Sequence, residues 1–120
     1  VFKFDLKAGV IHLMAGTGET GFTGNGGPAK LAKLSGPKGI AIDSEGNAWL
    51  ADTESHTIRI IDARTGNIEL MAGTGEKGNG GDGDPLKCAL SRPHGIFVDA
   101  DGAIYIGDSE SQRVRALRKG

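Results

Sequence analysis

The sequence has a single cysteine, few aromatic residues and almost no net charge. Cys88 is the one cysteine among 120 residues, so the chain forms no internal disulfide and contains no cysteine-based zinc box. We expect this thiol to pack as a small apolar side chain. The 14 Lys and Arg residues against 15 Asp and Glu residues give a net charge of −1. This balance argues against a dominant electrostatic attraction to nucleic acid.

Long apolar runs and a targeting leader are also missing. The apolar stretches are only a few residues long, whereas a bilayer crossing needs about 20, and no charged-then-apolar leader opens the chain. Because the first residue is Val1 rather than Met, we interpret the chain as processed or excised, and a lost signal peptide remains an alternative. The 38% hydrophobic content indicates a soluble globular protein. A secreted or periplasmic location stays open.

What the sequence does have is an internal repeat. The string Met-Ala-Gly-Thr-Gly occurs at residues 14–18 and again at 71–75. Residues 34–62 and 90–118, aligned at an offset of 56, share 11 identities in 29 positions. The offset of the first string is 57 (71 − 14), so one residue is gained or lost in the Gly-rich segment that follows it. A repeat of this period predicts two copies of one structural unit.

Each copy reads as short strands separated by turns. The first copy predicts strands at 39–43, 48–51, 57–62 and 68–72, and the second at 95–99, 103–107 and 113–117. A four-stranded antiparallel meander cannot cover both of its faces alone, so it must stack on neighbours. Near-identical repeats favour the blades of a β-propeller over a two-layer sandwich.

The connections between successive units contain a proline followed by helix-forming residues. Residues 28–34 and 85–90 both have this pattern, which predicts one or two helical turns. We expect four leucines to pack these turns onto the blades: Leu31, Leu34, Leu86 and Leu90.

Several consecutive motifs resemble the NHL repeat found in bacterial NHL β-propellers. They are the AGTG turn, GGPA, a short Leu-bearing helix, PKGIAID and GNAWLADTESHTIRIID. The resemblance implies an all-β fold of four-stranded blades in a ring of about six. Residues 1–15 are then the third and fourth strands of a preceding repeat, 16–72 the first repeat, and 73–118 a second, incomplete one. The chain is interpreted as an excerpt of a longer propeller or as one of three copies that close a ring.

Repeated aspartates and arginines are the clearest polar pattern. Asp52 and Asp108 occupy equivalent positions, and Arg59 and Arg115 follow each of them by seven residues. We expect these pairs to fix the turns of the scaffold. Calcium ligation by the two carboxylates at the channel mouth is the alternative.

Residues that do not repeat are the better candidates for ligand binding. Lys38 and His94 stand at equivalent positions before the first strand of each unit, and a ligand-facing residue can differ between blades. His94 is a candidate zinc ligand, proton carrier or polar contact, and His56 is a weaker candidate. In a propeller these residues and the turns after Asp52 and Asp108 share one face, where binding residues gather.

Two motif matches are weak. Residues 16–21 and 73–78 fit GxGxxG, but no helix opens there, as a dinucleotide site requires. Asp82 and Asp84 lie in a Gly-rich stretch that fits a calcium-binding nonapeptide core. That core occurs once, without the tandem array that builds such a site, so a solvated turn is the simpler interpretation.

The sequence favours a non-catalytic binding or scaffolding module, because no nucleophile and base are paired. Its loop-bearing face would hold a protein, a glycan or a small ligand, and the rest of a propeller or further copies would close the ring. No cofactor is assigned. One alternative is an enzyme, since propellers similar to NHL domains include amidating lyases and gluconolactonase-like hydrolases that hold a metal, here Ca²⁺ or Zn²⁺. RNA binding is a second alternative, disfavoured by acidic turns and scarce aromatic residues.

Overall fold

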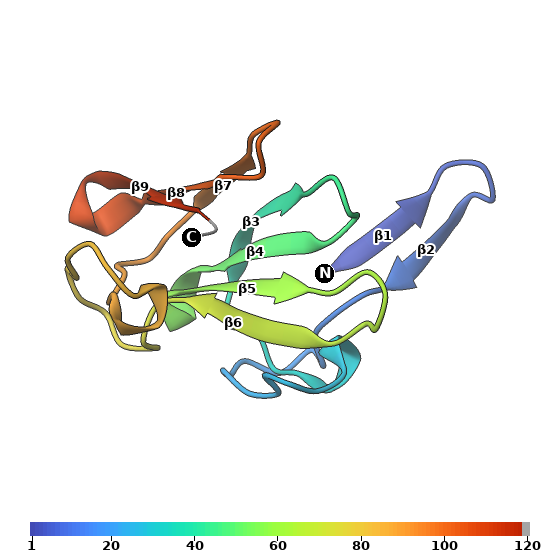
Figure 1. Ribbon diagram of the computed structural model, residues 1–120. Coiled ribbons are helices and arrows are strands. Elements are labelled where there is room, and N and C mark those ends of the chain that lie inside the picture. The colour runs from blue at the N-terminus through green and yellow to red at the C-terminus, as the bar shows by residue number, and fades with distance from the viewer. Residues whose placement is uncertain (119–120) are drawn as a thin grey trace.

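The computed structural model describes residues 1–118. It confirms the prediction of an all-β chain: these residues form nine short strands in three antiparallel sheets. Figure 1 shows the sheets side by side in chain order. The strands are β1 (Phe2–Asp5), β2 (Val10–Leu13), β3 (Pro37–Ile42), β4 (Ala48–Asp52), β5 (Thr57–Ile61), β6 (Ile68–Ala72), β7 (Gly95–Val98), β8 (Ile104–Asp108) and β9 (Arg113–Leu117).

The middle sheet is a complete four-stranded meander, and the sheet that follows it is built in the same way. Its strand order is β3-β4-β5-β6, and we call it blade 1; the sheet β7-β8-β9 is blade 2. In the β1–β2 hairpin Phe2 is opposite Leu13, as Arg59 of β5 is opposite Leu70 of β6. The hairpin therefore corresponds to the third and fourth strands of a blade.

Apolar side chains on both faces of blade 1 hold the sheets together. All five residues of β4 are buried, and because strand residues alternate between faces, they feed two clusters. Leu50 packs with Ala15 and Leu34 on one face, and Trp49 on the other packs with Ile104, among others. The main apolar core therefore lies between sheets, as expected for stacked blades, and its burial is the main stabilising term.

Blades 1 and 2 approach most closely where β3 and β7 begin. A methyl group at Gly39 would collide with the carbonyl oxygen of His94. The hydroxyl of Thr53 donates to the carbonyl oxygen of Pro93 at 2.6 Å, and both residues are buried. The glycine is therefore required by close packing between backbones.

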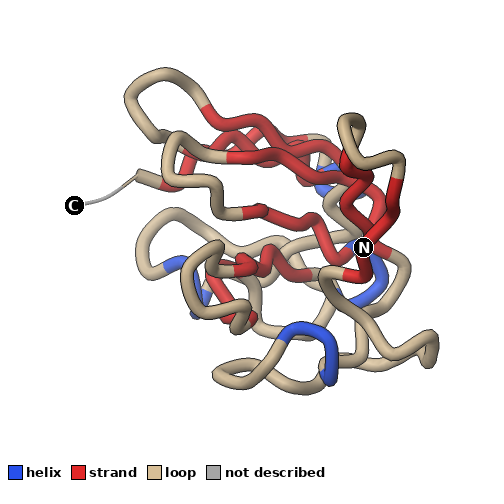
Figure 2. The backbone as a smooth tube through the Cα atoms, turned by 90° about the vertical axis from the view of Figure 1, so that its right-hand side faces the viewer, coloured by secondary structure: helices blue, strands red, loops and turns tan. Residues whose placement is uncertain are grey.

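Four turns of 3₁₀ helix connect the strands: η1 (Ala29–Leu31), η2 (Thr53–Ser55), η3 (Pro85–Lys87) and η4 (Ser109–Ser111). Figure 2 shows the strands lying together and the long loops making up much of the remaining side. Each helical turn has three residues, so within the described part of the chain no helix is long enough to cross a membrane.

The predicted packing of the four leucines is only half right. Leu34 and Leu90 are buried, but Leu31 is 72% exposed and Leu86 is 50% exposed. The predicted helices are single 3₁₀ turns, which are tighter than an α-helix. In the first connection Ala29 and Ala32 face the core in place of Leu31.

Candidate functional site

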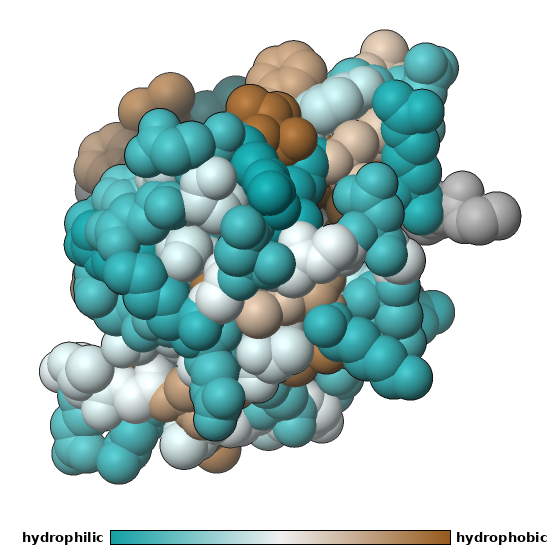
Figure 3. Space-filling view, turned by 90° about the vertical axis from the view of Figure 1, so that its left-hand side faces the viewer, coloured by the Kyte–Doolittle hydropathy of each residue, from teal (hydrophilic) through white to brown (hydrophobic). Residues whose placement is uncertain are grey.

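The loops at one end of the blades carry the charged side chains that the sequence pattern singled out. At this end β4 and β8 finish and β3 and β7 begin. Figure 3 looks onto it and shows mainly hydrophilic residues. We call it the loop face and define it by five charged residues: Lys38, Glu54, Lys77, Arg92 and Glu110.

Asp52 lies beneath the loop face, and both of its carboxylate oxygens bind groups of the protein itself. One of its carboxylate oxygens accepts a hydrogen bond from the backbone N–H of Ser35 at 2.8 Å. The other accepts from the hydroxyl of Ser55 at 2.9 Å and faces Arg59 at 3.3 Å. The side chains of Asp52 and Arg59 are fully buried. Asp52 thus ties the incoming loop to the β4–β5 turn.

Arg59 is held by further acceptors in the Gly-rich loop. Its guanidinium donates to the side-chain oxygen of Asn25 at 3.1 Å and to the carbonyl oxygens of Lys33 and Thr23 at 2.9 and 2.6 Å. The ring of Phe22 lies 5.1 Å from the guanidinium carbon, within cation–π range. Burial lowers the pKa of Arg59, and the carboxylate of Asp52 acts in the opposite direction. This arginine therefore fastens the Gly-rich loop to blade 1.

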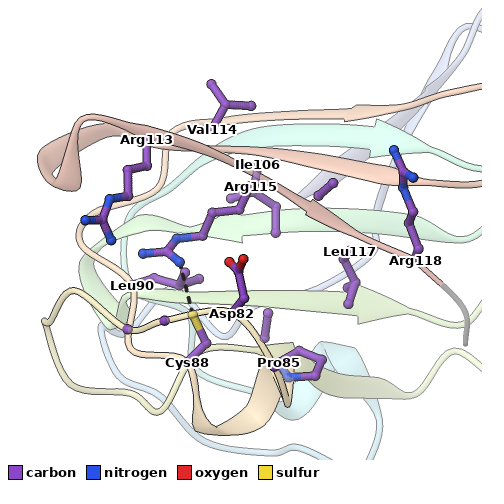
Figure 4. Close-up of a pocket in the computed structure, with 15 residues that line it drawn as sticks. Asp82, Pro85, Cys88, Leu90, Ile106, Arg113, Val114, Arg115, Leu117 and Arg118 are labelled. Carbon is purple, nitrogen blue, oxygen red and sulfur yellow. Dashed lines mark hydrogen bonds between the residues drawn. The ribbon is translucent and has the colours of Figure 1, made fainter.

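Blade 2 repeats the contacts of the aspartate, but its arginine uses different nitrogens and partners. Asp108 accepts from the backbone N–H of Ser91 at 2.7 Å and from the hydroxyl of Ser111 at 2.6 Å, and it pairs with Arg115 at 2.9 Å. One terminal nitrogen of the Arg115 guanidinium lies 3.3 Å from the thiol sulfur of Cys88 (Figure 4), and the other lies 3.5 Å from the side-chain oxygen of Asn79. In Arg59 both terminal nitrogens bind backbone carbonyls instead. Both aspartates, considered above as ligand or metal contacts, are buried within the scaffold.

Arg92 is the centre of the ion network on the loop face. Its guanidinium bridges two carboxylates on different blades, Glu54 at 2.6 Å and Glu110 at 2.5 Å. Lys38 lies 3.6 Å from Glu54, and Lys77 lies 2.6 Å from Glu110. The network thus contains three cations and two carboxylates, so it has one positive charge in excess.

These contacts shift the titration of the groups involved. Hydrogen bonds from Lys77 and Arg92 lower the pKa of Glu110 to about 2. A hydrogen bond from Arg92 lowers the pKa of Glu54, and the two carboxylates raise the pKa of Arg92. Both carboxylates therefore stay ionised at neutral pH.

The two histidines of the site both bind the backbone of Arg92, His56 as an acceptor and His94 as a donor. The N–H of Arg92 donates to Nδ1 of His56 at 3.0 Å, so the proton of a neutral His56 is on Nε2. Nδ1 of His94 lies 2.7 Å from the carbonyl oxygen of Arg92 and must donate to it. A neutral His94 therefore keeps Nε2 as an acceptor. Neither His56 nor His94 is deeply buried.

The two aspartates of the acidic Gly-rich segment differ in their surroundings. Asp84 caps η3 by accepting a hydrogen bond from the N–H of Leu86 at 3.0 Å, while Asp82 is exposed. Among residues 1–118, no group of three His, Cys, Asp or Glu side chains is placed to hold a metal ion.

Sequence reasoning missed Arg92, although the repeat contains a signal for it. The equivalent residue of the first copy is Gly36, and both residues have left-handed backbones, with φ of +61° for Gly36 and +47° for Arg92. Glycine adopts this conformation without steric cost, and arginine rarely does. Arginine in place of glycine at a left-handed position therefore marks a residue that the scaffold does not require.

Comparison with known proteins agrees with the geometry of the two blades. The family model of the NHL repeat matches residues 34–61 and 90–117. The chain contains two NHL repeats. NHL repeat-containing protein 2 from Gallus gallus is 28% identical to it over 98% of the chain and 17% of that protein.

Solved structures share the fold of these NHL repeats. A structural genomics protein of unknown function from Bacteroides thetaiotaomicron superposes with a TM-score of 0.84 and 21% identity, over 96% of this chain and 28% of that one. An auxiliary nutrient binding protein from Bacteroides ovatus gives a TM-score of 0.77 and 24% identity, over 98% of this chain and 31% of that one. The NHL chain spans less than a fifth of the length of the curated relatives that it matches.

Proposed function

We propose that the chain is a non-catalytic binding module whose loop face holds a ligand bearing acidic groups. The observation that carries this proposal is the Arg92 network. Arg92 takes a left-handed backbone at the junction of the two blades, where the other repeat has glycine. Its neighbours Lys38 and Lys77 add positive charge, and the network has one cation more than it has carboxylates.

The polar residues fall into a scaffold group and a surface group, and this separation supports the proposal. The repeated aspartates are buried and hydrogen-bonded by protein groups, and each pairs with its arginine, so they hold the scaffold. The loop-face residues that differ between repeats, such as Arg92, lie at the end of a rigid frame, which is where proteins place binding groups. Lys38 and His94 stand at equivalent positions but offer a cation and a nitrogen acceptor, respectively. A carboxylate could meet the cations of the network, and a ligand hydroxyl could donate to Nε2 of His94.

The experiment uses one probe for each class of acidic ligand. A hexaglutamate peptide, a heparin oligosaccharide and citrate represent an acidic protein segment, an acidic glycan and a small acid. Each is titrated into the protein, with binding followed by calorimetry and by amide chemical shifts of the loop face. We expect at least one to bind, and to bind more weakly as salt is added, because exposed charges are screened.

Arg92→Gly is the informative variant, because the first repeat shows that glycine fits this backbone. It should weaken binding without loss of folded structure. Lys30→Ala, in the η1 turn away from the network, is the matched control and should bind as the parent does. Binding that Arg92→Gly leaves unchanged would contradict the proposal, as would failure of all three probes to bind. Retention of single-stranded RNA at moderate salt would favour the nucleic-acid alternative instead.

A further inference from the structure

Arg92 stands between two residues that the blades hold in place. The N–H of Ser91 donates to the carboxylate of Asp108 at 2.7 Å, and the carbonyl oxygen of Pro93 accepts from the hydroxyl of Thr53 at 2.6 Å. Arg92 itself has a left-handed backbone, with φ of +47°, which brings the Cβ of an L-residue too close to a carbonyl oxygen. A backbone of this kind persists only where neighbouring groups hold it.

Two imidazole rings hold the peptide groups of Arg92. Its N–H donates to Nδ1 of His56 at 3.0 Å, and its carbonyl oxygen lies 2.7 Å from Nδ1 of His94. Among the described residues, these are the hydrogen bonds that the backbone of Arg92 makes. The direction of its side chain, and with it the bridge from the guanidinium to Glu54 and Glu110, therefore depends on the two rings.

The backbone of His56 is itself fixed, so its ring is presented from a rigid position. His56 ends η2 with a left-handed backbone, φ of +58° and ψ of +41°, and its N–H donates to the carbonyl oxygen of Thr53 at 3.1 Å. A methyl group at Gly73 would collide with the carbonyl oxygen of His56. The equivalent residue of blade 2, Gln112, has nearly the same backbone, with φ of +61° and ψ of +36°. The fold therefore does not require a histidine at this position.

The two contacts respond differently to a proton. Nδ1 of His56 accepts only while it keeps its lone pair, and both ring nitrogens of a protonated imidazole are donors. Protonation of His56 therefore sets a donor against the N–H of Arg92. His94 already donates from Nδ1, and its second proton goes to Nε2, so protonation leaves its bond to Arg92 in place.

We propose that His56 is a positioning residue for Arg92 that acts only in its neutral form, so that acid releases the arginine from its ligand-binding position. The consequence for binding rests on the proposed function, since Arg92 is the residue assigned there to the ligand, but the contact itself is measurable without a ligand. Histidine side chains change charge between about pH 5 and pH 8, and we expect the release within this range.

The surrounding charges act in the same direction. The elements next to His56 are η2, the segment after β6, the loop before β7 and, through the ion network, η4 and the start of β3. Their charged and titratable groups are Glu54, Lys77, Arg92, His94, Glu110 and Lys38. The buried Asp–Arg pairs beneath them are neutral as pairs. With His94 neutral, the group has one positive charge in excess, so a proton on His56 adds repulsion of Arg92 to the loss of its hydrogen bond.

The test follows the histidine rings and the amide of Arg92 by NMR, in the full chain without ligand, from about pH 8 to about pH 5. At the upper end His56 should have its proton on Nε2 and His94 should have its proton on Nδ1. As the pH falls, the amide proton of Arg92 should move upfield with the same midpoint as the His56 ring. Its exchange, corrected for the intrinsic rate, should become at least about fivefold faster, as for one lost hydrogen bond. A neutral His56 with its proton on Nδ1 overturns the proposal, and so does an Arg92 amide that does not follow the titration of His56.

Two variants make the test specific. His56→Asn is the conservative one, because Oδ1 of asparagine takes the place of Nδ1 and asparagine tolerates a left-handed backbone. Its oxygen accepts at every pH, so the Arg92 amide signal should stay in the bonded position while His94 still titrates. His56→Gly suits the same backbone but has no acceptor, so it should give the acid position at every pH. An Arg92 amide that shifts with pH in His56→Asn as it does in the parent would refute the role of His56.

A binding measurement separates this role from the proposed function. The sulfates of the heparin oligosaccharide stay ionised over this range, and the added charge on the histidines is common to both proteins of each comparison at one pH. The loss of affinity caused by Arg92→Gly should be smaller at about pH 5.5 than at about pH 7.5, and in the His56→Asn background it should be the same at both. An equal loss at both pH values in the parent contradicts control by His56. If none of the acidic probes binds, the proposed function fails, whereas the ring and amide measurements decide the role of His56 by themselves.

Discussion

The buried pair of Asp52 and Arg59 allows a quantitative test of what holds an NHL blade together. Asp52→Asn keeps the shape of the side chain but removes its charge. Breaking a buried ion pair by removing one partner costs roughly 3–5 kcal/mol, because the remaining charge has no counterion. Arg59 keeps three hydrogen-bond acceptors, in Asn25, Lys33 and Thr23. We therefore expect a loss of about 3 kcal/mol, at the lower end of that range.

Blade 2 supplies the matched comparison. The side chain of Arg115 is 13% exposed, whereas that of Arg59 is fully buried. Water can therefore solvate Arg115 once its partner is neutral. Asp108→Asn should cost less, about 2 kcal/mol, which lies within the range of roughly 1.5–3 kcal/mol for one hydrogen bond to a charged group.

The assay is urea unfolding followed by the fluorescence of Trp49, the single tryptophan, which is buried between the blades. A loss near 3 kcal/mol is a large part of the 5–15 kcal/mol that stabilises a typical domain, so the midpoint should move clearly. The reasoning fails if Asp52→Asn costs less than about 1 kcal/mol, the size of one ordinary hydrogen bond. It also fails if Asp108→Asn proves the more damaging of the two.

Three further predictions use other features of the fold. The depressed pKa of Glu110 contributes stability that is complete above the usual carboxyl value of 4.5 and is lost as the pH falls towards about 2. Its side-chain carbon resonance should therefore titrate near pH 2. A titration midpoint near 4.5 would show that the ion network does not form. Gly39→Ala should separate the blades and lower the unfolding midpoint, since its methyl group would meet the carbonyl of His94; an unchanged midpoint would contradict that contact. Leu90→Ala should cost about 2–5 kcal/mol, as buried leucines do, whereas the half-exposed Leu86 should tolerate the same change, and equal effects would refute the assigned burial.

The sequence repeat predicted the sheets well because it compares the chain with itself. Strands β4, β5 and β6 lie at the positions predicted from alternation and turn residues, within one residue. The Asp–Arg spacing of seven residues also predicted two contacts correctly, since the pairs form across β4–β5 and β8–β9. Local pattern and repetition point to the same structure there, which is the condition for a reliable inference.

The loops were harder to predict, for physical reasons. Whether Leu31 or Ala29 faces the core depends on whether the turn is 3₁₀ or α, and proline followed by helix formers does not distinguish them. The role of Arg92 depends on carboxylates from two blades, Glu54 and Glu110, which are far apart in the sequence. Their proximity follows from blade packing and not from local pattern.

Comparing the two repeats position by position separates three kinds of residue. Residues identical in both and buried in both, such as Asp52 and Asp108, are needed inside every blade. Residues that differ and lie at the surface, such as Gly36 and Arg92, are free to serve a ligand. Equivalent residues buried in one repeat but exposed in the other, such as Ile58 and Val114, belong to neither group. Within residues 1–118 a neighbouring blade covers Ile58 and none covers Val114, so the difference in exposure identifies the surface where another blade fits.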